Sequence, residues 1–185
     1  MKIVAVLGSP RSQGNSASLA YHLLDTAQGL GAETEVYLLN QMKFQGCQGC
    51  GSCKTKADHC VVEDDLAPLL AAVKDAEVLV LASPVYFGDF SGQMKCFFDR
   101  TYSFANPDFT SRLQPGKKSA LILAQADPNA DSFADIFPRY ERWLKLFGFG
   151  ENYRLQATGV FEAGEVKGQG EMLKQAEEIA GKLMA

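Results

Sequence analysis

Residues 2–16 read Lys-Ile-Val-Ala-Val-Leu-Gly-Ser-Pro-Arg-Ser-Gln-Gly-Asn-Ser, and this stretch decides the fold class. Its first part, Lys2–Leu7, is short, apolar and rich in β-branched residues, as a strand buried on both faces should be. Beyond the polar loop, Ser16–Ala27 places its apolar side chains on one helical stripe. A strand that runs through a polar loop into an amphipathic helix is typical of a parallel α/β sheet.

Strand-like and helix-like runs continue to alternate after this first unit. Four more short apolar runs have the character of buried strands: Glu35–Leu39, Glu77–Ala82, Ser119–Ala124 and Arg154–Phe161. Near the end, Glu171–Leu183 repeats the one-sided apolar pattern of an amphipathic helix. Such alternation implies parallel strands joined by right-handed crossovers. The sequence therefore predicts an α/β fold with a five-stranded parallel sheet that binds ligands beyond the carboxyl ends of its strands.

The composition is that of one ordinary globular domain, which we expect to span residues 1–185. Hydrophobic residues make up 46% and charged residues 22% of the chain, which excludes disordered and fibrous classes. The formal net charge of −4 and the scattered basic residues indicate neither nucleic-acid binding nor a membrane-binding patch. The apolar start, Met1–Gly8, is too short for a signal peptide, and no stretch is long enough to span a bilayer. We therefore expect a cytoplasmic protein.

The loop after the first strand carries many groups that bind phosphate. Its backbone amides stand at a helix start, beside the following side chains: the hydroxyls of Ser9, Ser12 and Ser16, the Asn15 amide and the Arg11 guanidinium. The loop has neither the Gly-Lys-Ser/Thr ending of a Walker A loop nor the dinucleotide G-x-G-x-x-G pattern, so a nucleoside triphosphate is not expected. A plain turn with a serine N-cap is the alternative interpretation. The density of phosphate-binding groups favours a phosphate site.

Four of the five cysteines fall within fourteen residues, in the loop of residues 44–63 that follows the second strand. They are Cys47, Cys50, Cys53 and Cys60. Spacings of two residues let three thiolates converge on one small object, and nearby glycines relieve the backbone crowding. A cubane iron–sulfur cluster fits this arrangement best, with a bare or disulfide-forming thiol cluster and a zinc site as alternatives. Because the loop follows a strand, we expect it at the same sheet edge as the phosphate loop.

A third loop follows the third strand, where residues 82–95 read Ala-Ser-Pro-Val-Tyr-Phe-Gly-Asp-Phe-Ser-Gly-Gln-Met-Lys. Aromatic faces, small residues and free backbone amides at the binding edge suit a flat, partly polar ring. Taken alone, Tyr86, Phe87 and Phe90 are more often core or interface residues. Just beyond this loop, we expect Asp99 and Arg100 to pair with each other or to join a subunit contact.

These motifs together resemble the flavodoxin-like NADPH-dependent FMN reductases. The matching segments are Gly-Ser-Pro-Arg-x-x-Gly-Asn-Ser from Gly8, Ser-Pro-Val-Tyr-Phe-Gly from Ser83, and the Gln-Met-Lys-x-Phe-x-Asp-Arg helix of residues 93–100. Within this family, the compact four-cysteine loop resembles that of the iron–sulfur flavoproteins. The resemblance implies a flavodoxin-like three-layer sandwich with strand order 2-1-3-4-5.

The resemblance also implies roles for individual residues. Around the FMN phosphate it places Ser9, Arg11, Asn15 and Ser16, with Gly14 in the same loop, and against the isoalloxazine it places Pro84, Val85, Tyr86, Phe87 and Gly88. It further implies that a [4Fe-4S] cluster is ligated by Cys47, Cys50, Cys53 and Cys60. No side chain is required as a general acid or base, because the redox chemistry belongs to the cofactor.

The implied function is that of an FMN-dependent oxidoreductase, which takes electrons from NADPH or NADH and passes them to an acceptor of quinone or flavin type. The alternative is a non-enzymatic electron carrier that accepts electrons from ferredoxin. A third class is a thiol-based sensor or zinc-stabilised binding protein that has lost flavin. We also predict a homodimer or homotetramer with a contact over Phe90–Phe104, whose aromatic residues exceed what one helix face can bury.

Overall fold

Five parallel strands form the central sheet of the computed structural model, which describes all 185 residues. The strands are β1 (Lys2–Leu7), β2 (Glu33–Leu38), β3 (Val78–Tyr86), β5 (Lys117–Ala124) and β6 (Phe149–Ala157). They lie side by side in the order β2-β1-β3-β5-β6, and each neighbouring pair is parallel. The order reverses at β1, so the loops after β1 and β3 flank the switch point at which open α/β sheets bind ligands.

The prediction of five strands is wrong in one respect, because the sheet has a sixth. The short strand β4 (Asp89–Phe90) folds back antiparallel on the end of β3. Leaving β4 out, the parallel strands follow the predicted order 2-1-3-4-5. β3 also continues four residues past its predicted end at Ala82, because Ser83 and Pro84 pair with β5, and Val85 and Tyr86 pair with β4.

The last strand lies earlier in the chain than the pattern predicts. We expected Arg154–Phe161, whereas β6 is Phe149–Ala157, and its first half pairs with the start of β5. The strand stops before Gly159, whose φ of 65° belongs to the left-handed region rather than to a strand. Residues 158–161 therefore form a loop at the carboxyl edge of the sheet.

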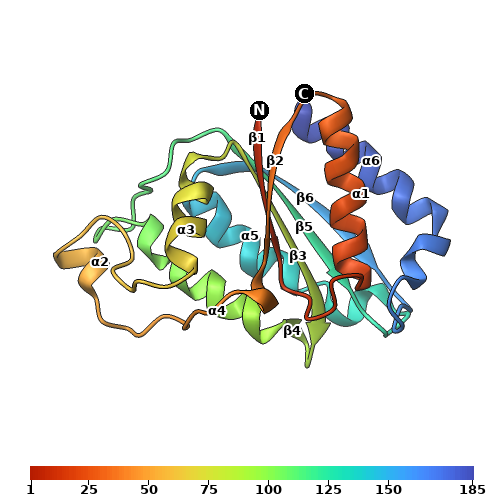
Figure 1. Ribbon diagram of the computed structural model, residues 1–185, viewed down its shortest axis with the longest axis horizontal. Coiled ribbons are helices and arrows are strands. Elements are labelled where there is room, and N and C mark those ends of the chain that lie inside the picture. Colours follow the sequence, from red (N-terminus) through yellow and green to blue (C-terminus); the bar gives the residue numbers. More distant parts are fainter.

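Helices cover both faces of the sheet and complete a three-layer flavodoxin-like sandwich (Figure 1). One face carries α1 (Asn15–Gly29) and α6 (Gly170–Met184), and the other carries α3 (Leu66–Asp75), α4 (Gly92–Arg100) and α5 (Ile136–Leu146). Alternate side chains of β1 divide between two hydrophobic cores: Ile3, Ala5 and Leu7 pack with α1 and α6, while Val4 and Val6 pack with the other layer. None of the helices combines the length and the apolar character that a membrane span needs.

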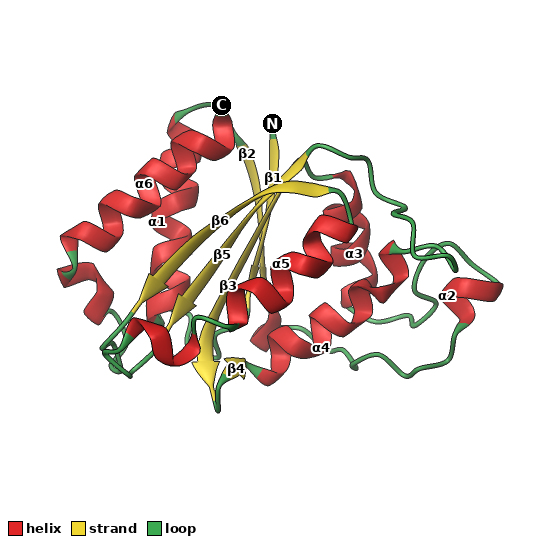
Figure 2. Cartoon of the chain, turned by 180° about the vertical axis from the view of Figure 1, so that it is seen from behind, coloured by secondary structure: helices red, strands yellow, loops and turns green.

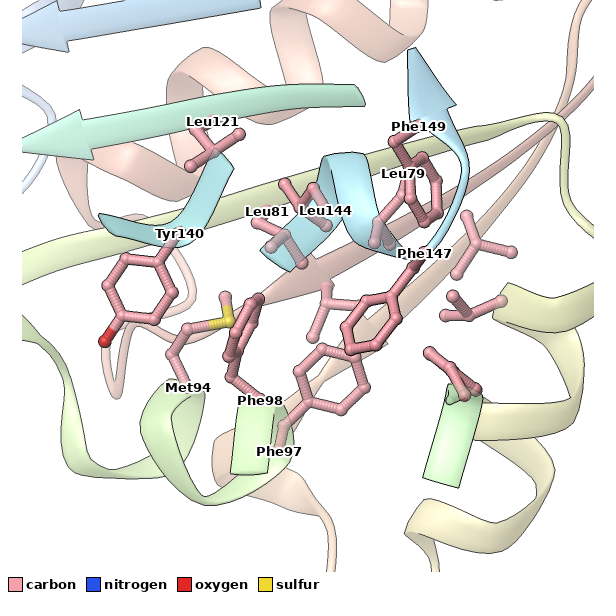
Figure 3. Packing of buried hydrophobic residues seen from close by; sticks show 14 of the residues in the cluster. Leu79, Leu81, Met94, Phe97, Phe98, Leu121, Tyr140, Leu144, Phe147 and Phe149 are labelled. Atoms are coloured by element: carbon pink, nitrogen blue, oxygen red, sulfur yellow. The ribbon is translucent and has the colours of Figure 1, made fainter. Parts of the chain in front are cut away.

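The core beneath α4 and α5 is rich in aromatic side chains. Figure 3 shows Leu79, Leu81 and Leu121 of the strands facing Met94, Phe97 and Phe98 of α4, with Tyr140 and Leu144 of α5 beside them. Phe90 stacks on Tyr140 with ring centroids 3.8 Å apart. At the start of α4, the N-cap Ser91 donates its hydroxyl to the Gly8 carbonyl at 2.6 Å. This packing fixes the first turn of α4 beneath the loop that follows β1.

The remaining elements are short and lie in the connections. They are α2 (Ser52–Thr55) and the 3₁₀ turns η1 (Leu39–Gln41), η2 (Thr101–Phe104), η3 (Ala130–Phe133) and η4 (Glu165–Gly168). Both views place α2 and its flanking loops outside the sandwich, beyond α3 and α4 (Figures 1 and 2). The long connection between β2 and α3 is thus an excursion from an otherwise regular fold.

Candidate functional site: a phosphate-type cavity and a cysteine cavity

A cavity of about 180 Å³ lies at the carboxyl edge of the sheet, between the loops that follow β1, β3, β5 and β6. Eight of the ten residues that the resemblance places around FMN line it: Ser9, Arg11, Gly14, Asn15, Ser16, Pro84, Val85 and Tyr86. Four further residues complete the lining: Ala124, Ala126, Val160 and Phe161. No sequence motif indicates these four apolar residues, and two of them lie inside the strand that the pattern predicts over residues 154–161.

The hydroxyl of Ser16 has no hydrogen-bond partner. The residue is 1% exposed and lies in the first turn of α1. The neighbouring Ser9 hydroxyl is already satisfied, since it donates to the Arg11 carbonyl at 2.9 Å and accepts from the Arg11 amide at 3.1 Å. A buried unpaired hydroxyl costs about 1–3 kcal/mol. The amides of the first helical turn lack intrahelical partners too, and the helix dipole favours an anion there.

The other residues of the loop set its shape. A side chain at Gly14 would place its Cβ 2.5 Å from the Ser9 hydroxyl, so only glycine fits without a shift. Asn15 braces the loop after β6, because its amide donates to the Glu162 carbonyl and accepts from the Val166 amide. Arg11 donates to the Phe161 carbonyl through Nη1 at 3.0 Å and is otherwise exposed. The loop thus presents the Ser16 hydroxyl, helix amides and the remaining N–H groups of Arg11 to an anion.

The β3–β4 hairpin supplies the apolar side of the cavity. Pro84, Val85 and Tyr86 line it from the end of β3. Phe87 and Gly88 form the two-residue turn, with φ of 48° and 80° respectively, and neither residue lines the cavity. Positive φ at both positions is the conformation of a type I′ hairpin turn. It directs Phe87 into solvent, where the side chain is fully exposed at 112% of its reference area.

All four clustered cysteines line a second cavity of about 320 Å³, which shares no residue with the first. Cys47 and Cys50 are exposed, Cys53 is buried and Cys60 is half-buried, and none forms a disulfide. Hydrogen bonds from Ser52 hold the pKa of the Cys50 thiol below its ordinary value, whereas burial raises the pKa of the Cys53 thiol. No group of three or more His, Cys, Asp or Glu side chains is arranged as ligands of a single metal ion.

The cysteine cavity does not lie at the carboxyl edge of the strands, where we expected it. Its loop leaves that edge and runs along α4 to the other end of the helix, so α2 projects well away from the hairpin (Figure 1). The two ends of the long connection between β2 and α3, which carries the cysteines, lie next to each other. There the Lys43 amide donates to the Asp65 carboxylate at 2.6 Å, and the Asp65 amide donates to the Lys43 carbonyl at 3.3 Å.

Three basic side chains hold the cysteine loop in this place. Arg100, at the end of α4, bonds residues on both sides of the cysteines. Arg112 donates to the Cys53 carbonyl at 2.8 Å. Lys54 donates to the carbonyls of Tyr102 and Ala105 and lies 3.9 Å from the centre of the Tyr102 ring. These long-range contacts account for the course of the loop.

The expected pairing of Asp99 with Arg100 is wrong. Adjacent residues of a helix point in different directions, whereas residues four apart lie on one face. Asp99 accordingly pairs with Lys95 at 2.6 Å. Arg100 is buried and forms a two-point ion pair with Asp64, at 2.8 Å and 3.2 Å.

This pair leads to a prediction about acid stability. The pKa of Asp64 lies below the ordinary value, because hydrogen bonds from Arg100 and the Gln45 amide outweigh burial, which by itself raises it. A lowered folded-state pKa contributes stability above the unfolded pKa of about 3.9, and this stability is lost as the pH falls through the folded value. Asp64→Asn should therefore lower the free energy of unfolding by about 3 kcal/mol at neutral pH.

Urea unfolding from neutral pH to about pH 3 measures this effect. The difference between wild type and Asp64→Asn should shrink as the pH falls below about 4, because protonation then removes from the wild type the Asp64 charge that the variant already lacks. The exposed Asp135, which pairs with Arg139 at 3.3 Å, provides the control, and Asp135→Asn should change little at any pH. A constant difference for Asp64→Asn across the range would contradict the prediction.

The fold is that of a flavodoxin-like protein, and its first cavity combines hydrogen-bond donors at the first strand–helix turn with an apolar slot beside them. A model of the NADPH-dependent FMN reductase family matches residues 1–129. The chain belongs to this family, as the resemblance of its motifs predicts.

The similar proteins include two named iron–sulfur flavoproteins. One, from Archaeoglobus fulgidus, is 37% identical over 106 residues, covering 57% of this chain and 48% of the relative. Another, from Methanocaldococcus jannaschii, is 38% identical over 101 residues, covering 55% of this chain and 52% of the relative. The chain therefore matches about half the length of these curated relatives.

A solved structure extends the comparison to the whole fold. An FMN-dependent NADH-azoreductase from Bacillus anthracis, solved with FMN, superposes with a TM-score of 0.77 and covers 100% of both chains. At 16% sequence identity this likeness establishes the flavodoxin-like fold alone.

Proposed function

We propose that the chain is an FMN-binding oxidoreductase, which takes electrons from reduced nicotinamide and passes them to an acceptor of quinone or flavin type. The observation that carries the proposal is the unpaired Ser16 hydroxyl, 1% exposed, in a loop otherwise built for an anion. A phosphate oxygen would satisfy this hydroxyl and the adjoining helix amides at once. The flanking apolar slot suits a flat ring.

The chain's contribution would be binding and orientation. Ser16, Arg11 and the first amides of α1 would hold the phosphate, and Pro84, Val85 and Tyr86 would lie against the ring. FMN supplies hydride and electron transfer when it is bound. Neither Phe87 nor Gly88 lines the cavity, and Phe87 is fully exposed, so we assign the ring contact to the end of β3 rather than to the turn.

A binding titration followed by kinetics tests this function. Purified protein should bind one FMN per chain and bind riboflavin far more weakly, because riboflavin lacks the phosphate. The FMN-loaded protein should then oxidise NADPH or NADH in steady state with a quinone or free flavin as acceptor. Equal affinity for FMN and riboflavin would contradict the phosphate assignment.

The alternative function is that of an electron carrier which accepts electrons from ferredoxin. The exposed cysteine loop favours it, since a cofactor at the surface of the molecule suits exchange with a protein. Rapid reduction by ferredoxin, together with no turnover on NADPH or NADH, would establish the carrier and reject the reductase.

We further propose that Cys47, Cys50, Cys53 and Cys60 ligate a [4Fe-4S] cluster. Four thiols that line one cavity are the donor set such a cluster needs. The backbone is suited to it, because Gly49 and Gly51 adopt φ of 62° and 68°, which lets the chain turn tightly between the cysteines. A zinc ion or a bare thiol group would use the same residues, and metal analysis after anaerobic purification separates the three.

Only part of the predicted Phe90–Phe104 contact is available to the proposed oligomer. Phe97, Phe98 and Phe104 are buried within the chain, so they leave no excess aromatic surface. The remaining candidates are Tyr102 and Trp143, exposed by 42% and 40% and lining a groove of about 340 Å³ between α4 and α5.

Light scattering tests the homodimer or homotetramer at micromolar concentration. Tyr102→Glu with Trp143→Glu should shift the protein to monomer, because two charges would be buried in the contact. Leu30→Glu is the matched control, since Leu30 is an exposed apolar residue at the end of α1, on the other face of the sheet from the groove. A monomeric wild-type protein with FMN bound would contradict the prediction.

A further inference from the structure

Every N–H group of the Arg100 guanidinium is used in the cysteine loop. Nε donates to the Cys60 sulfur at 3.0 Å. Nη1 donates to the Gln45 carbonyl at 2.9 Å and to Asp64 at 2.8 Å, and Nη2 donates to the Val62 carbonyl at 3.0 Å and to Asp64 at 3.2 Å. A guanidinium has five N–H donors, so none is left over.

Four of these five contacts join the two ends of the loop. Gln45 precedes the first cysteine, and Val62 and Asp64 follow the last one. Arg100 itself is 1% exposed and sits at the end of α4, whose Phe97 and Phe98 are fixed in the aromatic core. The loop is therefore closed around a side chain that the sandwich holds rigidly.

The contact with Cys60 is not needed for closure. The bonds to Gln45, Val62 and Asp64 already hold both ends of the loop. Nε nevertheless points at a sulfur that lines the cysteine cavity. A hydrogen bond to a ligating sulfur stabilises negative charge on an iron–sulfur centre, and such bonds help to set its reduction potential.

We propose that Arg100 is a positioning residue for the cysteine site, which closes the loop through four bonds and raises the reduction potential of the bound cluster through the fifth. The second part rests on the proposed [4Fe-4S] cluster, whereas the first part concerns the protein alone. Lysine cannot replace arginine here, because an ammonium lacks the planar fork that reaches five acceptors at once.

The first arm of the test uses cluster-loaded protein prepared without oxygen. Arg100→Lys keeps a cation beside Asp64 but loses the N–H bond to Cys60, so its midpoint potential should be more negative than that of wild type. Arg112→Lys is the control, because Arg112 also anchors the loop, through the Cys53 carbonyl, but donates to no sulfur. Its potential should equal the wild-type value.

An unchanged potential in Arg100→Lys, or equal shifts in both variants, would overturn the tuning role. If Arg100→Lys does not fold, Asp64→Asn decides the matter. It keeps the donor to Cys60 and removes the counter-charge, so its potential should rise. A fall would overturn the proposal.

The second arm uses cofactor-free protein and trypsin, whose target residues Lys54 and Lys56 lie inside the loop. Cleavage there should be about tenfold faster in Arg100→Lys than in wild type, because cleavage follows local opening. Lys95→Gln, a surface change on the same helix, should leave the rate unchanged. Unchanged cleavage of Arg100→Lys would overturn the closing role.

The two arms separate failure of this inference from failure of the proposed cluster. Wild-type protein that holds no iron after anaerobic reconstitution rejects the cluster and, with it, the tuning role. The trypsin result then still decides whether Arg100 closes the loop.

Discussion

The double variant Arg11→Gln with Ser16→Ala should bind FMN about 100- to 10,000-fold more weakly than wild type and bind riboflavin almost unchanged. Each lost hydrogen bond to a charged phosphate contributes about 1.5–3 kcal/mol, and each 1.4 kcal/mol is tenfold in affinity. Riboflavin has no phosphate, so it makes neither contact. Fluorescence titration of both ligands measures the difference.

Ser16→Ala alone should weaken FMN binding but stabilise the fold. In protein without FMN it should raise the free energy of unfolding by about 1 kcal/mol, because it removes a buried hydroxyl that has no partner. Ser18→Ala is the matched control: this serine lies one position past the first turn and donates to the Gln13 carbonyl outside the cavity. An FMN-free Ser16→Ala protein less stable than wild type would mean that the hydroxyl has a structural role.

Replacing any one of the four clustered cysteines by alanine should reduce iron from about four atoms per chain to near zero while FMN remains bound. The two cavities share no lining residue, so loss at one should spare the other. Iron and flavin are measured on the same anaerobically purified sample, because exposed thiolates oxidise in air.

Cys96→Ala is the internal control for this experiment. The fifth cysteine lies on α4 outside the cysteine cavity, and Gly46 approaches its sulfur. Its removal should leave the iron content unchanged. Iron retained by Cys47→Ala, Cys50→Ala, Cys53→Ala or Cys60→Ala would show that the residue concerned is not a ligand, and no iron in any reconstituted protein would reject the cluster.

The sequence predicts the parallel strands well because each is a short apolar run buried on both faces. It places their ends poorly, since the end of β3 is held by pairing with β4 and β5, and β6 begins where Lys117 and Lys118 provide partners. Those partners lie far away in the chain. A sequence pattern depends only on neighbouring residues, so it does not indicate these distant partners.

The same limit applies to the candidate sites. The residues of the phosphate loop are contiguous, so one sequence motif indicates all of them. Phe161 lines the same cavity but lies about 150 residues further along the chain. The pairing of Arg100 with Asp64 spans 36 residues and is invisible to helix spacing, which only indicates neighbours three or four apart. The course of the cysteine loop depends on that pairing, so the position predicted for the loop from the sequence is wrong.

The hydrogen bonds between Lys43 and Asp65 bear on how this protein could change over evolutionary time. They bring the two ends of the cysteine excursion together, and no strand of the sheet lies between them. A segment whose ends are adjacent can be inserted, exchanged or deleted without moving the rest of the fold. The twenty or so residues that carry the cysteines can thus be exchanged as a unit, but their loss would also require a change at Arg100, because the partners of its buried guanidinium all lie in this segment.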